Sequence, residues 1–331
     1  MYSIETNSLL KKFGKVIAVD NISFQVEEKE IFGFLGPNGA GKSTTMMILT
    51  TLLKPTSGKA LVAGYDVVTQ AKEVRQNIGF VQQETTVDEF LTGRENLALQ
   101  ARLNHIPKNL AQKRIDGILE LIELSDRQNE PVLTYSGGMR KRLDIAGGLL
   151  HMPKILFLDE PTVGLDIQTR RKIWEYIKKI HDEYQMTIFL STHYMEEADN
   201  LCDRIGIIDY GKIQAIDIPQ KMKESLGNEV IIFSISEGPV STIIEKIKEI
   251  SLVKEITSND KQITVYANKT IEVIPQIFQI SSELNLKIKT LSISQPTLDD
   301  VFISYTGHEL RDGANSFNKR KEHATMKRLR S

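Results

Sequence analysis

A glycine-rich segment between a buried strand and a helix constrains the fold of this chain more than any other feature. Residues 31–35 are almost all apolar, as in a strand buried on both faces. The pattern G-x-x-x-x-G-K-[ST] is then satisfied by Gly36, Pro37, Asn38, Gly39, Ala40, Gly41, Lys42, Ser43 and Thr44. A strand that leads through such a loop into a helix is typical of a parallel α/β sheet. An ordinary glycine-rich turn is the alternative, and this context disfavours it.

The chemistry of the loop follows from its residue types. Glycines let backbone N–H groups turn inward around phosphate oxygens, and the N-terminus of the following helix attracts negative charge. Lys42 is expected to reach the β- and γ-phosphates of a nucleotide, and Ser43 to ligate Mg²⁺. The sequence therefore predicts a site for a nucleoside triphosphate.

Two further strand ends carry candidate catalytic residues. Asp159 follows the apolar run 155–158, so it is expected at the carboxyl edge of the sheet, where it would hold Mg²⁺. Glu160 is placed to polarise a water in line with the γ-phosphate, although a solvated acidic turn is the simpler alternative. His193 follows the strand-like run 187–191 and is expected to donate to the γ-phosphate, whereas a lone histidine is more often structural.

The chain is expected to form two domains. Residues 1–220 alternate strand and helix patterns, with a helical subdomain over 92–150 that Thr92 and Glu95 open with a capping box. A hairpin turn is expected at residues 210–212, and a boundary near Pro219–Asn228.

A second domain over 228–306 has the order βαββαβ, which predicts a small α+β ferredoxin-like fold. Its expected elements are strand 230–235, helix 240–250, strands 252–257 and 262–267, helix 271–284 and strand 287–292. Beyond Pro296, Leu298, Val301, Phe302 and Tyr305 recur at helical spacing. The basic segment 311–331 is expected to be a disordered tail, with lipid or nucleic-acid contact as a minority alternative.

Composition limits the partners of the chain. The 331 residues carry a formal net charge of -1, so no global field favours nucleic acid or an anionic membrane surface. The single cysteine, Cys202, indicates a reducing compartment. The polar N-terminus does not resemble a signal peptide, and no run reaches the roughly 18 apolar residues of a spanning helix. We therefore expect a chain that neither crosses a membrane nor is exported.

The order of the motifs resembles a known family. The phosphate loop, Gln83, the segment 135–139 (Tyr-Ser-Gly-Gly-Met), Asp159 with Glu160, Asp166 and His193 together resemble the ATP-binding subunit of an ATP-binding cassette (ABC) transporter. The resemblance covers about residues 3–220. Its Ser-Gly-Gly segment separates the family from kinases, small GTPases and RecA-like motors. It implies a P-loop NTPase cassette, with a mixed sheet and an α-helical subdomain.

The resemblance implies further roles. Two cassettes close head to tail, so Ser136 and Gly138 would contact the γ-phosphate of ATP bound by another copy. Asp166 would bridge the two sites, and Gln83 would couple Mg²⁺ and the attacking water to the membrane partner. Phe13 would stack on adenine in place of the usual tyrosine, with a core phenylalanine as the alternative.

Details of the motifs indicate a subfamily. Tyr135 and Met139 replace the usual leucine and glutamine of the signature segment, while its serine and glycines are retained. Residues 135–144 and 298–302 resemble drug-resistance exporters typified by the daunorubicin ATPase, in which a separate six-helix permease spans the membrane. The later segment is also explained simply as an amphipathic docking helix.

The leading functional expectation is an ATP-hydrolysing subunit that uses ATP and Mg²⁺ and pairs with a second cassette. It would power a separately encoded permease for drug, lipid or small-molecule efflux. Its near-neutral charge disfavours nucleic acid as a partner. The helical insertion from Thr92 and the loop after Gln83 would form the docking surface for that permease. The expected location is cytoplasmic, on the inner face of the cell membrane. The alternatives are a soluble ABC ATPase with a regulatory role, including one acting on ribosomes or DNA, and a second domain that binds a small effector.

Overall fold

The computed structural model describes residues 1–227, 229–236, 240–259 and 262–308, which divide into two compact units. The first unit runs from Met1 to Ile216, and the second begins at Asp217. The segment 311–331, which we expected to be a tail, lies outside the described residues.

Two sheets form the first unit. Its strands are β1 (Tyr2–Phe13), β2 (Val16–Glu27), β3 (Ile31–Leu35), β4 (Ser57–Val62), β5 (Tyr65–Asp66), β6 (Ile78–Val81), β7 (Ile155–Asp159), β8 (Thr187–Thr192), β9 (Arg204–Asp209) and β10 (Lys212–Asp217). The larger sheet has the order β10-β9-β3-β8-β7-β6, and the strands from β9 to β6 pair in parallel. The smaller sheet, β2-β1-β4-β5, is antiparallel. The expected parallel α/β sheet is thereby confirmed.

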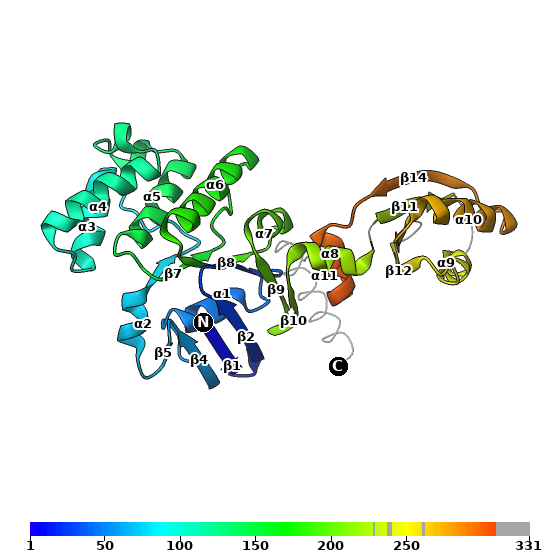
Figure 1. The fold of residues 1–331 in the computed structure, drawn as a ribbon, viewed down its shortest axis with the longest axis horizontal. Coiled ribbons are helices and arrows are strands. Elements are labelled where there is room, and N and C mark those ends of the chain that lie inside the picture. Colours follow the sequence, from blue (N-terminus) through cyan, green and yellow to red (C-terminus); the bar gives the residue numbers. More distant parts are fainter. Residues whose placement is uncertain (228, 237–239, 260–261, 309–331) are drawn as a thin grey trace, which may run out of the picture. The chain divides into compact units, whose positions relative to one another are not determined.

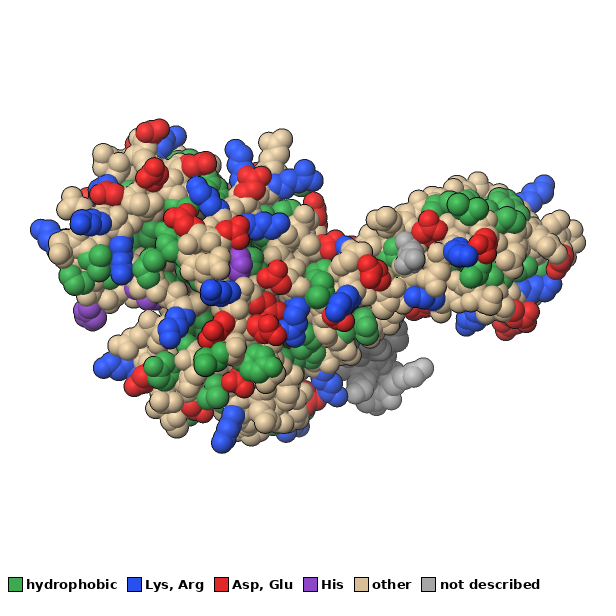
Figure 2. Space-filling model, viewed as in Figure 1, with side chains coloured by type: hydrophobic (Ala, Val, Ile, Leu, Met, Phe, Trp, Pro, Cys, Tyr) green, Lys and Arg blue, Asp and Glu red, His purple; other side chains and the backbone are tan. Residues whose placement is uncertain are grey.

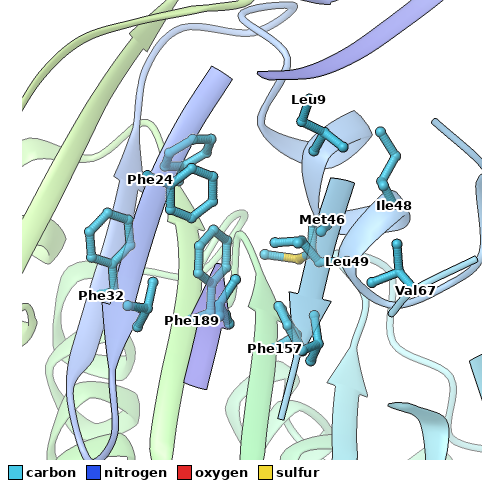
Figure 3. Close-up of a cluster of buried hydrophobic side chains, with 14 of the residues drawn as sticks. Leu9, Phe24, Phe32, Met46, Ile48, Leu49, Val67, Phe157 and Phe189 are labelled. Atoms are coloured by element: carbon cyan, nitrogen blue, oxygen red, sulfur yellow. The ribbon is translucent and has the colours of Figure 1, made fainter. Parts of the chain in front are cut away.

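A hydrophobic core lies between the two sheets and contains helix α1 (Lys42–Leu49). Phe24 of β2 stacks on Phe32 of β3 with ring centroids 5.8 Å apart, and Phe189 of β8 lies 5.7 Å from Phe32 (Figure 3). Burying each such ring contributes about 1.5–3 kcal/mol. This packing fixes the strands β3 and β8, whose carboxyl ends carry the phosphate loop and His193.

The remaining helices of the first unit are α2 (Ala71–Asn77), α3 (Gly93–Leu103), α4 (Lys108–Leu121), α5 (Gly137–Leu149), α6 (Ile167–Tyr184) and α7 (Met195–Leu201), with 3₁₀ turns at Ser125–Arg127 and Val132–Thr134. The capping box of Thr92 and Glu95 is confirmed at the start of α3. Figure 1 shows α3, α4 and α5 gathered on one side of the larger sheet, with β1, β2 and β4 on the other. The helical insertion is therefore a layer of its own.

A two-residue turn joins β9 to β10. Tyr210 and Gly211 both have positive φ, 48° and 76°, as a tight hairpin requires. The predicted hairpin is confirmed. The turn also contacts the phosphate loop, because the Gly211 N–H donates to the Ala40 carbonyl at 2.9 Å.

The second unit contains an antiparallel sheet of the order β12-β13-β11-β14. Its elements are α8 (Pro219–Leu226), β11 (Glu229–Ile235), α9 (Val240–Lys248), β12 (Val253–Asn259), β13 (Gln262–Ala267), α10 (Thr270–Glu283), β14 (Ile288–Ser294) and α11 (Leu298–Thr306). The predicted βαββαβ succession is confirmed, and the strand order is that of a ferredoxin-like fold. The segment in which we placed a boundary contains the helix α8.

The helix after Pro296 is confirmed as α11, and it contacts α8 within its own unit. Leu298, Val301 and Phe302 are buried, whereas Tyr305, which we expected on the same face, is exposed. The Tyr266 hydroxyl donates to Asp300 Oδ1 at 2.8 Å, which ties β13 to the first turn of α11. The expected amphipathic face is therefore used to complete this unit.

Candidate functional site

The phosphate loop connects β3 to α1, and close packing requires glycine at two of its positions. Gly41, immediately before α1, has a φ of 107°, which side chains rarely adopt. A Cβ added at Gly36 would lie 2.1 Å from the Ile208 carbonyl oxygen, and one at Gly41 would lie 2.4 Å from that of Ala18. The neighbouring strands thus hold the loop in a single path.

Lys42 is the first residue of α1 and is buried inside the loop. Its Nζ donates to the carbonyls of Gly36 at 2.7 Å and Pro37 at 3.1 Å. The same Nζ lies 3.3 Å from Glu160 Oε1. Burial lowers the pKa of Lys42, while Glu160 and Asp159 oppose that effect. Lys42 Nζ therefore lies at the N-terminus of α1, where phosphate binds.

Asp159 is the last residue of β7, at the carboxyl edge of the sheet where we expected it. Its Oδ1 accepts from Ser43 Oγ at 3.2 Å and also from the Ser191 hydroxyl of β8. These hydroxyl and carboxylate oxygens are the hard ligands that Mg²⁺ prefers. The oxygen set at Ser43 and Asp159 therefore fits a magnesium ion.

Glu160 is buried directly after β7 in an unusual backbone conformation. Its φ is 45°, and its N–H donates to both the carbonyl and the hydroxyl of Ser191, each at 3.1 Å. Such backbone strain is found where the surrounding structure dictates a conformation, and it clusters at active sites. Ser191 thus positions both acidic residues from the neighbouring strand.

Two neighbouring side chains favour the charged form of Glu160. Burial would raise its pKa, but His193 and Lys42 outweigh burial and hold the pKa below its ordinary value. His193 Nδ1 lies 3.2 Å from Glu160 Oε2, a contact without hydrogen-bond geometry. The Glu160 carboxylate is thus ionised at neutral pH, as a general base must be. The structure brings Lys42, Ser43, Asp159, Glu160 and His193 together.

Gln83 lies in the loop that follows β6, and α5 holds this loop. Lys141 Nζ donates to the carbonyl of Gln82 at 2.7 Å and to that of Gln83 at 3.3 Å. Asp144, one turn further along α5, accepts from the Thr86 hydroxyl at 2.7 Å. Burial lowers the pKa of Lys141 and raises that of Asp144. The buried pair therefore fastens the Gln83 loop to the helix that follows the signature segment.

Ser136, Gly138 and Asp166 form a second group, at the adjoining N-termini of α5 and α6. Ser136 Oγ accepts from the Met139 N–H at 3.3 Å, and Asp166 caps α6 through the Thr169 N–H at 3.0 Å. A Cβ at Gly138 would lie 2.5 Å from Thr169 Cγ2, so any other residue there would force the Thr169 side chain to move. Within the described residues, no hydrogen bond or ion pair joins this group to the phosphate loop.

Phe13 stands at the end of β1 and is 48% exposed as a residue, which excludes the alternative of a core phenylalanine. Lys11 Nζ lies 4.9 Å from the ring centroid. An exposed aromatic face at a strand end is suited to stacking with a base.

Several residues around the site belong to none of the sequence motifs. They are Ser191, Lys141, Asp144 and Glu197. Glu197 is fully buried, and its Oε1 accepts from the Thr162 hydroxyl at 2.7 Å and from Trp174 Nε1 at 2.9 Å. Burial raises its pKa. A charged residue at an apolar-periodic position, between Met195 and Ala198, was the available signal.

Two known protein families match this chain, one in each unit. Residues 19–163 match the model of the ABC transporter family, and residues 219–306 match that of the C-terminal domain of DrrA1-3-like ATP-binding proteins. A daunorubicin resistance ATP-binding protein, DrrA2 of Streptomyces coeruleorubidus, is 37% identical over 309 residues, which are 93% of this chain and 96% of the relative. This chain belongs to the ABC transporter ATP-binding proteins. Like other ABC cassettes, it is an ATPase.

Two further comparisons agree with this family. The linearmycin resistance ATP-binding protein LnrL of Bacillus subtilis is 35% identical, covering 93% of this chain and 100% of the relative. A solved dimeric structure of the ATP-binding cassette MJ0796, in a post-hydrolysis state with ADP and Pi, is 28% identical with a TM-score of 0.58. It covers 65% of this ABC protein and 98% of that chain. No helix among the described residues is long and apolar enough to span a membrane.

Proposed function

We propose that this ATPase dimerises around two ATP molecules and powers a separate membrane permease. The observation that carries the proposal is the separation of two residue groups. One group, around Lys42 and Glu160, surrounds the phosphate loop, whereas Ser136, Gly138 and Asp166 lie together without an interaction that links them to it in the described residues. A second copy, closing head to tail, supplies the missing half of each site.

Each residue of the first group then has a role. Lys42 binds the β- and γ-phosphates, Phe13 stacks on adenine, and Glu160 accepts a proton from the attacking water. His193 donates to the γ-phosphate. Ser43, Asp159 and Gln83 hold Mg²⁺, which neutralises the developing phosphate charge when it is bound.

A polar cavity supports the proposed docking surface for the permease. It has a volume of about 190 Å³ and lies between α3, α5, β6 and the loop after Gln83. Thr86, Asn96, Gln100, Asp144 and His151 contribute polar groups to its wall. A permease segment seated there would contact the loop that Lys141 holds, and so would sense the nucleotide site.

The relatives support efflux as the direction of transport. Those named above confer resistance to daunorubicin and linearmycin, so we propose that the permease exports a drug, lipid or other small molecule. The chain would then act from the cytoplasmic face of the cell membrane. The second unit, which contains its own hydrophobic cluster, is proposed as an accessory domain of this assembly.

Figure 2 shows acidic and basic side chains interspersed over the visible face of the first unit.

The variant Glu160→Gln tests the shared site. It should lower ATP turnover by about 10²-fold or more, because the general base is lost, yet retain ATP. Light scattering of the variant with ATP and Mg²⁺ should report a dimer. The exposed Glu175→Gln on α6 is the matched control and should hydrolyse ATP normally. If Glu160→Gln stays monomeric with bound ATP, the shared-site proposal is wrong.

A further inference from the structure

Tyr194 and Arg170 form a stack beside His193, the residue that we expect to donate to the γ-phosphate. The imidazole ring contacts the ring of the next residue, Tyr194, with centroids 4.2 Å apart and planes inclined at 43°. The guanidinium carbon of Arg170, on α6, lies 3.9 Å from the centroid of the Tyr194 ring. At these distances both contacts are favourable, and both depend on the face of Tyr194.

Arg170 also holds the turn that begins at Glu160. Its Nε donates to the Leu165 carbonyl at 3.1 Å, directly before Asp166. A single guanidinium therefore contacts the ring of Tyr194 and the backbone of this turn at once. The guanidinium is planar and rigid, so these two contacts link the turn directly to the ring.

A second link joins the same two segments. The Thr162 hydroxyl, in the middle of the turn, donates to the buried Glu197 of α7 at 2.7 Å. At the other end, the Tyr194 N–H donates to the Thr192 hydroxyl at 2.9 Å, which fixes the backbone on which both rings stand. Because the backbone is held, the orientation of the His193 imidazole depends on its side-chain contacts, namely Tyr194 and Glu160.

We propose that Tyr194 is a positioning residue that orients His193 for ATP hydrolysis, and that Arg170 couples this orientation to the turn from Glu160 to Asp166. The inference rests on the proposed role of His193. It adds that the aromatic ring, and not only the histidine, is needed for turnover. When a second copy contacts Asp166, the same stack carries that contact to the γ-phosphate.

Steady-state ATP hydrolysis by the full chain tests the ring. Tyr194→Ala should lower kcat about tenfold while KM for ATP stays within about twofold, because small misplacements of a catalytic group reduce the rate of the chemical step. Tyr194→Phe keeps the ring face and should restore most of kcat. A Tyr194→Ala variant with unchanged kcat, or a Tyr194→Phe variant as slow as Tyr194→Ala, would overturn the proposal.

Arg170→Met tests the coupling without removing an aromatic ring. It should lower kcat several-fold, and the double variant with Tyr194→Ala should be no slower than Tyr194→Ala alone. The matched control is Arg171→Met. Arg171 is an exposed neighbour on α6 that also reaches α7, through Glu196 at 3.5 Å, so its loss should leave kcat unchanged. If the Arg170 and Tyr194 substitutions lower kcat independently, so that their effects multiply in the double variant, the coupling is wrong.

His193→Ala separates this inference from the proposed function. If it lowers kcat while Tyr194→Ala does not, the stack has no positioning role, and the function of the site stands. If His193→Ala itself has unchanged kcat, the role of His193 fails and the inference with it. The imidazole signals of His193 in NMR spectra should shift in Tyr194→Ala and Arg170→Met, but not in Arg171→Met.

Discussion

Glu160 Oε1 lies 3.3 Å from Lys42 Nζ, and both side chains are buried. The residue expected to bind phosphate and the residue expected to activate water therefore contact each other in this conformation. Lys42 completes its contacts with two carbonyls of its own loop. Binding of a triphosphate must exchange the contact with Glu160 for contacts with phosphate oxygens.

The first prediction concerns this exchange. Replacing Glu160 with glutamine should tighten ATP binding by about 1 kcal/mol, or about fivefold in Kd, because an ion-pair partner of Lys42 and a negative charge near the γ-phosphate are removed. Dimerisation would also tighten binding, so the comparison is made in the Ser136→Arg background, by titration with a fluorescent ATP analogue. Equal Kd values with glutamate and glutamine would show that the contact does not compete with ATP.

The second prediction concerns the signature segment. Ser136→Arg places a large cation at the start of α5, so it should block closure and hydrolysis while ATP binding to the monomer persists. Binding is measured by titration and closure by light scattering. Ser125→Arg, an exposed position in the same helical subdomain, is the control and should behave as the unmodified chain. Normal hydrolysis by Ser136→Arg would refute the role assigned to this segment.

The third prediction concerns the buried pair on α5. Lys141→Met leaves Asp144 without its cation and two loop carbonyls without their donor, so it should reduce the free energy of unfolding by about 3–5 kcal/mol. Urea unfolding followed by the fluorescence of Trp174 reports on the first unit, because it is the single tryptophan of the chain. Combining the change with Asp144→Asn should cost less than the two separate losses together. Additive losses would show that the pair is not coupled.

The fourth prediction concerns Glu197, whose pKa burial raises above an ordinary value of 4.5. The folded chain thus binds this proton more tightly than the unfolded chain, so the resulting stability is present below about pH 4.5 and is lost as pH rises through the folded pKa. Glu197→Gln does not titrate. Its unfolding free energy relative to the unmodified chain should therefore improve as the pH rises above 4.5, by about 1.4 kcal/mol for each tenfold difference in proton affinity. A pH-independent difference would contradict the prediction.

The phosphate loop and its acidic partners were predictable because short-range pattern decides them. Lys42 must follow the loop into a helix, and Asp159 must end a strand whose four preceding residues are apolar. Ser191 was not predicted as a site residue, although it contacts Asp159 and the Glu160 backbone. Its role follows from β8 lying next to β7, and the sequence does not state that pairing. The helix α8 was also missed, because its charged composition resembles that of a linker.

The sequence by itself determined the strand-loop-helix unit, the order of the motifs and the βαββαβ succession of the second unit. Backbone periodicity and glycine geometry act within a few residues, so they can be read along the chain. Only the tertiary structure decided which charges are buried, as with Lys141, Asp144 and Glu197, and that Arg170 contacts Tyr194. Burial and side-chain contact depend on residues from segments far apart in sequence. Only packing brings those segments together.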